Sequence, residues 1–282
     1  MGHLNVSFYV AKAMEALVGL AAELGMPHAF APHAEATLTL RELHIRFLRE
    51  AREGARLHIE GGVVELGDED AHLLFLMRHH TGELAATFQM RVAHVTAREG
   101  RAFPWPAWAR ARAAALPIEI PEKAQARSLA FGAGWSPAGL DPARALRRTG
   151  LGAVRSADVD PFGRMRPDRI MARVYEGMAP LLDGALAHLA AERVGGVALE
   201  YRFVYPAWAR IGDRLEVRSA FTAADARLRR MAHWVLDPHT GQAWAAAEVM
   251  LVGFDLEARK MISLEADELS ALQAIVRPGP SI

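Results

Sequence analysis

The segment 160–165 carries residue types that chemistry at a carbonyl group requires. It reads Asp-Pro-Phe-Gly-Arg-Met, and Pro167, which follows closely, is a favourable first residue of a helix. A carboxylate at Asp160, in a loop beside a helix N-terminus, can activate water as a general base or attack the carbonyl carbon itself. Because Asp-Pro-x-Gly is also a good turn sequence, the motif alone favours a structural role. Its place in an internal repeat, described below, leads us to interpret Asp160 as catalytic.

Backbone N–H groups in the same segment are candidate donors to a developing oxyanion. Those of Gly163, Arg164 and Met165 come directly before the helix, where the helix dipole also favours negative charge. Removing one such donor typically slows a reaction about 100- to 1,000-fold. Ordinary capping of the helix explains the same residues, so both interpretations stay open.

Three arginines crowd this helix start, at Arg164, Arg166 and Arg169. Positive charge there opposes the helix dipole by roughly 0.3 to 1 kcal/mol for each side chain, so another interaction must favour it. Phosphates or a carboxylate of a ligand are candidates. Ion pairs with Asp160 and Asp168 on a solvated face explain the arginines equally well.

The chain contains two copies of one unit. The segments 80–83 (His-Thr-Gly-Glu) and 239–242 (His-Thr-Gly-Gln) lie 159 residues apart (239 − 80), and 52–57 matches 210–215 at an offset of 158. The segment 2–15 can be laid on 163–176 at an offset of 161, which aligns Glu15 with Glu176. A period this long indicates a duplicated domain rather than a solenoid.

Each copy is predicted to contain one long helix followed by about four strands, an α+β arrangement. The first helix spans 6–24 and is apolar on nearly every face, so we expect it to be buried, with Asn5 or Ser7 as its cap. The second helix begins at Pro167 and runs to about 188, and a short closing helix spans 264–276. Alternating apolar residues and turn signals predict strands at 37–49, 55–66, 71–80, 83–96, 150–158, 197–206, 213–223, 228–237 and 242–254. The predicted domains are 1–99 and 149–282, joined by a linker at 100–148 that crosses between them.

Composition excludes several classes of function. The 282 residues include 33 Lys and Arg against 33 Asp and Glu, so no net charge would draw the chain to nucleic acid or to an anionic membrane. No cysteine is present, which rules out thiolate chemistry and fits a cytoplasmic protein, and no secretion signal is apparent. The 12 histidines show no metal-ligand spacing, and dinucleotide, Walker A and nucleophile-elbow motifs are absent.

A buried helix wrapped by an antiparallel sheet and entered through an acidic loop resembles the hotdog fold of acyl-CoA thioesterases, here in a tandem double form. The loop 160–163 is similar to the Asp-Pro-x-Gly loop of the 4-hydroxybenzoyl-CoA thioesterase group, and 2–5 (Gly-His-Leu-Asn) is similar to the end of the Asp-x-x-Gly-His-x-Asn form. The first copy begins after the place where its own aspartate would stand. Either the chain starts upstream of Met1, or the first site has decayed and the second works.

The resemblance implies hydrolysis of an acyl-CoA thioester at the second copy's loop, with coenzyme A as part of the substrate and no separate cofactor. Asp160 is the predicted base or nucleophile; Phe162, Gly163, Arg164, Met165 and Arg166 are the predicted substrate-binding residues. Because some hotdog thioesterases place their carboxylate on the helix, Glu176 is the alternative acid, although Lys12 with Glu15 and Arg173 with Glu176 also form i,i+3 ion pairs. His3 and Asn5 are assigned to a vestigial or shared site, and Asn5 is also a simple helix cap.

Two other functions are carried by the same fold. Hydratases and dehydratases of acyl thioesters usually place a histidine five residues after the aspartate, whereas this chain has Met165 there. A non-catalytic acyl-thioester binding protein is the third possibility, motivated by the incomplete first copy. The resemblance also implies a homo-oligomer.

Overall fold

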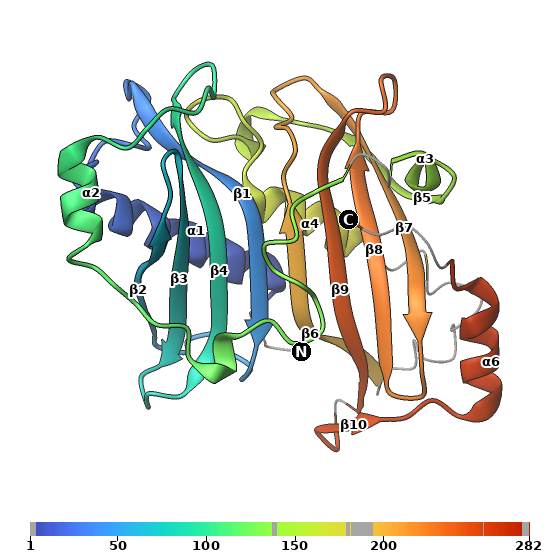
Figure 1. Ribbon diagram of the computed structural model, residues 1–282. Helices are drawn as coiled ribbons and strands as arrows, with labels where there is room; N and C mark the ends of the chain where they lie inside the picture. Colours follow the sequence, from blue (N-terminus) through green and yellow to red (C-terminus); the bar gives the residue numbers. More distant parts are fainter. Residues whose placement is uncertain (1–3, 137–139, 179–180, 182–193, 256, 278–281) are drawn as a thin grey trace.

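The computed structural model describes residues 4–136, 140–178, 181, 194–255, 257–277 and 282. One antiparallel sheet forms its body, with strands in the order β2-β3-β4-β1-β6-β9-β8-β7-β5 and with β10 paired to β9 (Figure 1). The strands are β1 Ala36–Phe47, β2 Leu57–Leu66, β3 Asp70–His79, β4 Leu84–Thr96, β5 Arg147–Ala153, β6 Val194–Val204, β7 Arg214–Ala224, β8 Leu228–Leu236, β9 Ala243–Asp255 and β10 Lys260–Ile262.

Two helices cover one face of the sheet, the face behind it in Figure 1, and they contact each other. α1 (Val6–Glu23) begins where the Asn5 side chain accepts the N–H of Ser7 at 3.0 Å, and α4 (Pro167–Glu176) begins with proline. The other helices among the described residues are α2 Ala107–Ala113, α3 Leu140–Arg144 and α6 Ala266–Ile275, with single 3₁₀ turns η1 Glu122–Ala124 and η3 Ser156–Asp158. Across the described ranges, no helix is long and apolar enough to cross a bilayer.

The first helix is buried against the sheet, as predicted, but not around its whole circumference. Its sheet-facing residues are buried, but Phe8 and Val18 are 57% and 44% exposed. The sheet and α4 cover only part of the helix circumference, so one side of α1, which carries these two apolar residues together with Lys12 and Glu15, remains accessible.

The structure repeats at the spacing seen in the sequence. Bulges interrupt the strand pairing at three positions of the first copy and again 158 residues later: 40/42 and 198/200, 63/65 and 221/223, 77/78 and 235/236. The N–H of Leu4 donates to the carbonyl of Ala51 at 2.8 Å, and that of Met165 donates to Ala209 at the same distance. The copies join where β1 pairs with β6 over residues 42–46 and 200–204. Each copy is therefore a helix against an antiparallel sheet, as predicted.

Two predicted elements differ from the observed ones. α4 ends at Glu176, where Gly177 provides the C-cap, and residues 179–180 and 182–188 of the predicted longer helix lie outside the described residues. The strand predicted at 150–158 is observed as β5 at Arg147–Ala153, because the chain then turns through η3 to reach Asp160. The predicted domain boundaries stay predictions.

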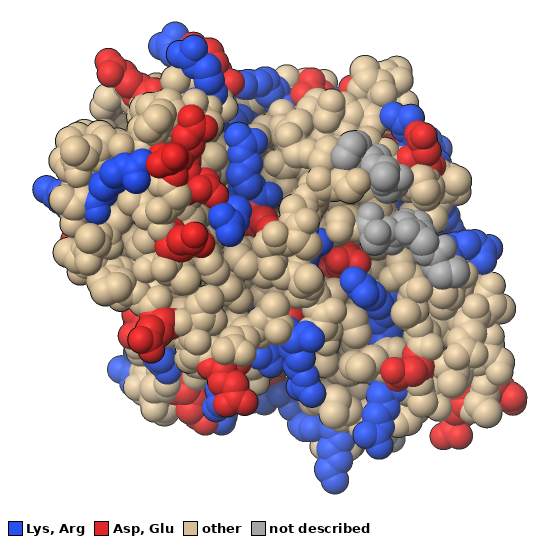
Figure 2. Space-filling view, in the orientation of Figure 1, with Lys and Arg blue, Asp and Glu red and all other residues tan. Residues whose placement is uncertain are grey.

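The linker crosses the face of the sheet opposite α1 and α4, in front of β1 and β6 in Figure 1. Two glutamates at equivalent positions of the copies hold it (200 − 42 = 158). Glu200 accepts the N–H groups of Arg127 and Ser128 at 2.9 Å each, and Glu42 accepts that of Gly132 at 3.1 Å. Figure 2 shows that acidic and basic side chains are interspersed over this face.

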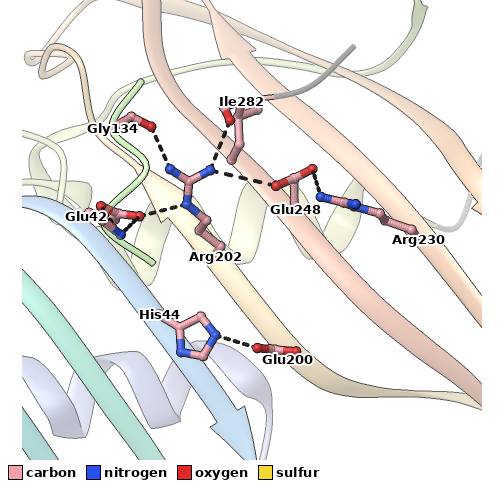
Figure 3. A network of polar contacts seen from close by, with 9 residues as sticks. Glu42, His44, Gly134, Glu200, Arg202, Arg230, Glu248 and Ile282 are labelled. Carbon is pink, nitrogen blue, oxygen red and sulfur yellow. Dashed lines mark hydrogen bonds and ion pairs between the residues drawn. The ribbon is translucent and has the colours of Figure 1, made fainter. Parts of the chain in front are cut away.

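A buried ionic network lies beneath the linker at the junction of the copies (Figure 3). Arg202 Nε binds Glu42 at 2.7 Å, and Arg202 Nη1 lies 3.8 Å from Glu248, which also binds Arg230 at 2.6 Å. The Nη2 group of Arg202 donates to the carbonyl of Gly134 at 2.6 Å. Glu42 and Arg202 are 3% and 2% exposed, so these contacts form away from water.

Stability is expected to fall in acid through Glu200. Burial alone would raise its pKa, but hydrogen bonds from His44 at 2.6 Å and from the two linker amides outweigh this and lower the pKa to about 2, from 4.5. The carboxylate therefore stabilises the fold above pH 4.5, and this stabilisation is lost as the pH falls from 4.5 to 2. The loss amounts to about 3 kcal/mol. Urea unfolding at pH 7 and pH 2 measures most of it; a Glu200→Gln variant whose stability depends on pH as strongly as wild type would contradict it.

Candidate active site

The loop before α4 is a compact turn built around the Asp160 side chain. Asp160 Oδ1 accepts the N–H groups of Phe162 and Arg164, each at 2.9 Å, and the Asp160 carbonyl accepts that of Gly163 at 3.0 Å. Gly163 has φ of 77°, which glycine adopts without strain. The turn interpretation of the motif is therefore correct as a description of its backbone, and it leaves Asp160 23% exposed in its side chain.

Arg164 connects this loop to the other copy. Its Nε donates to Asp160 Oδ2 at 3.0 Å, and its Nη1 donates to the hydroxyl of Thr39 on β1 at 2.8 Å. The side chain is only 7% exposed, and its guanidinium carbon lies 4.8 Å from the centre of the Phe162 ring. Arg41 is close by: burial, and then the positive charge of Arg164, lower the pKa of Arg41.

A cavity of about 440 Å³ lies between the first copy's helix and the second copy's loop. This volume is within the range of small-molecule sites. Its polar lining residues are Glu15, Thr39, Asp160, Arg164, Arg166 and Asp168; its apolar lining residues are Ala11, Met14, Val18, Phe30, Leu38, Leu40, Val159, Pro161, Met165, Pro167 and Trp208. The cavity thus combines a carboxylate loop with an extended apolar wall.

The backbone amides are not free to bind an oxyanion, which corrects the prediction made from the sequence. The N–H of Gly163 donates to the Asp160 carbonyl, that of Arg164 to the Asp160 carboxylate, and that of Met165 to the Ala209 carbonyl at 2.8 Å. These three N–H groups are used in hydrogen bonds that hold the loop and Asp160 in place. These three amides are therefore not available to polarise a substrate carbonyl.

The arginines at the helix start pair with neighbouring aspartates. Arg164 binds Asp160, and Arg166 binds both oxygens of Asp168 at 3.1 Å each, while Arg169 Nε lies 3.5 Å from Asp168. Of the two interpretations of this basic cluster, the structure supports the ion pairs. The arginines therefore neutralise the carboxylates of the cavity wall.

The sequence matches the thioesterase-like superfamily over residues 1–113 and 154–272, which is most of the chain and includes both copies. The chain belongs to this superfamily. The predictions of a thioester hydrolase and of a hotdog fold are therefore confirmed, and the cavity described above is a candidate active site of a thioesterase. A search of curated protein sequences found no match.

Solved structures share this architecture over nearly the whole chain. The acyl-ACP thioesterase from Bacteroides thetaiotaomicron is 11% identical with a TM-score of 0.66, and the match covers 89% of this chain and 90% of that one. The 12:0-ACP thioesterase from Umbellularia californica is 13% identical with a TM-score of 0.66, covering 89% and 88%. A Lactobacillus plantarum protein assigned as an oleoyl thioesterase is 12% identical with a TM-score of 0.67, covering 89% and 90%. At these identities the likeness establishes a shared hotdog fold and nothing about substrate.

The two helix glutamates have different surroundings in this thioesterase. Both form the predicted i,i+3 ion pairs, Lys12 with Glu15 at 2.8 Å and Arg173 with Glu176 at 3.4 Å. Glu15 lines the cavity together with Asp160, whereas Glu176 is not among the residues that line it. The structure therefore does not bring Asp160 and its predicted alternative together; the carboxylate that joins Asp160 is the first copy's Glu15.

The residues predicted from the start of the first copy are only partly placed. Asn5 is the cap of α1 and also bonds to the hydroxyl of Ser7 at 3.0 Å. His3 lies outside the described residues. The assignment of either residue to a second site stays a prediction.

Sequence reasoning missed Thr39 and Trp208, which come from strand and loop positions far from the motif. Trp208 lines the cavity and stacks on Tyr205, with ring centres 5.0 Å apart and planes inclined by 7°. Burial, and then the charge of Asp168, raise the pKa of Tyr205, so it stays a neutral phenol. Nothing in the sequence near either residue signals a site. Within the described part of the chain, no three metal-binding side chains lie together.

Proposed function

We propose that this protein is an acyl-CoA thioesterase that hydrolyses its substrate in the cavity between the copies. The observation that carries the proposal is the presence of Asp160 and Arg164 on one wall of a cavity whose other lining residues are mostly apolar. The acyl group would lie against the side chains of α1 and β1, with the thioester carbonyl beside Asp160. Because arginines already pair with two of the three lining carboxylates, an apolar acyl group fits this cavity better than one that carries its own carboxylate.

Asp160 is proposed to act as a general base on water. A carboxylate offers about four lone-pair positions, and the loop occupies three of them, two on Oδ1 and one on Oδ2. The remaining position on Oδ2 can accept a proton from water. Direct attack by Asp160 would weaken bonds that hold the loop together, so these contacts favour the general-base route.

Arg164 is proposed to polarise the thioester carbonyl. Its Nε and Nη1 are bound to Asp160 and Thr39, and neither bond uses Nη2. A guanidinium held in a largely buried site can stabilise the negative charge that develops on the carbonyl oxygen. This arrangement would replace the amide donors that the loop consumes internally.

Release of free thiol from a panel of thioesters tests the proposal. Short, long, branched and aromatic acyl-CoAs are compared, and we expect turnover with at least one apolar acyl group. Acyl carrier-protein thioesters are run beside them, because two proteins of the same fold are named as acyl-ACP thioesterases and favour this second candidate. Binding of acyl-CoA without release of thiol from any substrate would indicate a binding protein instead.

Replacing Glu15 with glutamine is expected to lower kcat by less than about 10-fold. Glu15 takes part in an exposed ion pair, and exposed ion pairs contribute little. The Glu15 side chain is 66% exposed and already paired with Lys12. Glu176→Gln, which removes the equivalent carboxylate outside the cavity, is the matched control and should leave kcat unchanged. A loss with Glu15→Gln as large as that with Asp160→Asn would place the base on α1.

A further inference from the structure

Thr39 is the polar contact through which the first copy reaches the second copy's loop. Along β1, pairing with β6 starts only at Glu42, so residues 36–40 pair with β4 and not with β6. Arg164 reaches Thr39 in this stretch, and Thr39 is 4% exposed. The hydroxyl is therefore a buried partner for a buried cation, supplied from 125 residues away in the sequence.

The position of the Arg164 guanidinium depends on both of its bonds. The bond from Nε to Asp160 leaves the group able to turn, and the second bond, from Nη1 to a hydroxyl fixed on a strand, sets the plane. Arg41 carries a like charge nearby and favours displacement of Arg164. Without Thr39, a nearly buried cation would lose one of its hydrogen bonds, and its remaining nitrogens would no longer point in fixed directions.

The second copy has no equivalent of this hydroxyl. At the spacing of 158 that relates the bulges on either side of this stretch, Thr39 corresponds to Val197 (197 − 39). A hydroxyl therefore stands on the strand that faces the complete acidic loop, and valine stands at the corresponding place of the other strand.

We propose that Thr39 is a positioning residue for thioester hydrolysis: from the first copy, it holds Arg164 in the orientation that supports Asp160 and polarises the substrate carbonyl. The inference rests on the proposed function. Both copies then contribute to the reaction site, since a strand of one copy aligns the carboxylate loop of the other. Thr39 itself need not touch the substrate.

The experiment compares Thr39→Val, which keeps the shape and removes the hydroxyl, with Thr39→Ser, which keeps the hydroxyl. Thr37→Val is the matched control: Thr37 lies two residues earlier on the same side of β1, is 0% exposed, and its hydroxyl has no partner among the described atoms. With the best substrate of the panel, Thr39→Val should lower kcat about 10- to 100-fold. KM should stay close to the wild-type value, Thr39→Ser should recover most of the activity, and Thr37→Val should behave as wild type.

Three results would overturn the role of Thr39. They are a wild-type kcat in Thr39→Val, equal losses in Thr39→Val and Thr37→Val, and failure of Thr39→Ser to recover activity. If circular dichroism shows that Thr39→Val does not fold, Thr39→Ala takes its place, because it removes the hydroxyl without adding a methyl group to the site. Full turnover in Asp160→Asn is a different result: it would refute Asp160 as the base, and the role of Thr39 would fall with it, whereas absence of thiol release from every substrate of the panel would refute the proposed function itself.

Discussion

Asp160→Asn is expected to lower kcat for thioester hydrolysis about 100- to 10,000-fold, the range for loss of a general base. The amide oxygen can still accept the N–H groups of Phe162 and Arg164, so the loop can keep its turn. The amide nitrogen takes no proton from water, and it places a donor against the Nε donor of Arg164, which now binds Oδ2 at 3.0 Å. Thiol release gives kcat, and calorimetry with a non-hydrolysable acyl-CoA thioether shows whether binding survives.

Asp168→Asn is the matched control for this result. Asp168 lines the same cavity, and the substitution removes the same charge, but its two oxygens are bound by Arg166 at 3.1 Å and its side chain is 13% exposed. We expect a few-fold effect at most. Equal losses in both variants would mean that the charge of the cavity, rather than a base at Asp160, drives turnover, and unchanged turnover in Asp160→Asn would exclude Asp160 as the base.

The parts of the site that the sequence predicts are those that depend on neighbours along the chain. The turn at Asp160, the helix start at Pro167 and the two ion pairs at i,i+3 spacing all follow from short-range rules. The internal repeat predicts in addition that this loop lies against a buried helix. The fold class can be predicted for the same reason, since alternating apolar residues and turn residues mark nearly every strand.

The parts that the sequence does not predict depend on contacts between distant segments. Whether an amide before α4 is free depends on the Ala209 carbonyl, and the partner of Arg164 depends on how β1 and β6 diverge. The glutamates of β1 and β6 illustrate the same limit. Alternation places Glu42 and Glu200 on the outward face of a sheet, where solvent is the default expectation, but the linker covers them and makes them buried acceptors.

Arg202→Met is expected to lower the free energy of unfolding by about 3 to 5 kcal/mol, the cost of leaving one partner of a buried ion pair alone. Glu42 would keep only its bond from the Gly132 amide, and the carbonyl of Gly134 would lose its donor. For a chain of this size the melting temperature should fall by roughly 10 °C. Arg91→Met is the matched control, because Arg91 pairs with Asp70 across two strands at 2.8 Å with side chains 36% and 39% exposed, and exposed pairs contribute at most about 1 kcal/mol.

A double variant tests whether the ion pair of Arg202 only stabilises the fold or also fixes how the two copies are arranged. If the cost of Arg202→Met arises from the uncompensated charge of Glu42, adding Glu42→Gln should recover part of the stability, since glutamine still accepts the Gly132 N–H. The recovered protein should also keep kcat, because Thr39 and Arg164 do not contact this network. Recovery of stability with loss of kcat would instead show that Arg202 sets how β1 and β6 meet, and through that junction the distance between Thr39 and the loop. A loss no larger than that of Arg91→Met would show that the network adds little to the junction that the strand pairing and the linker already form.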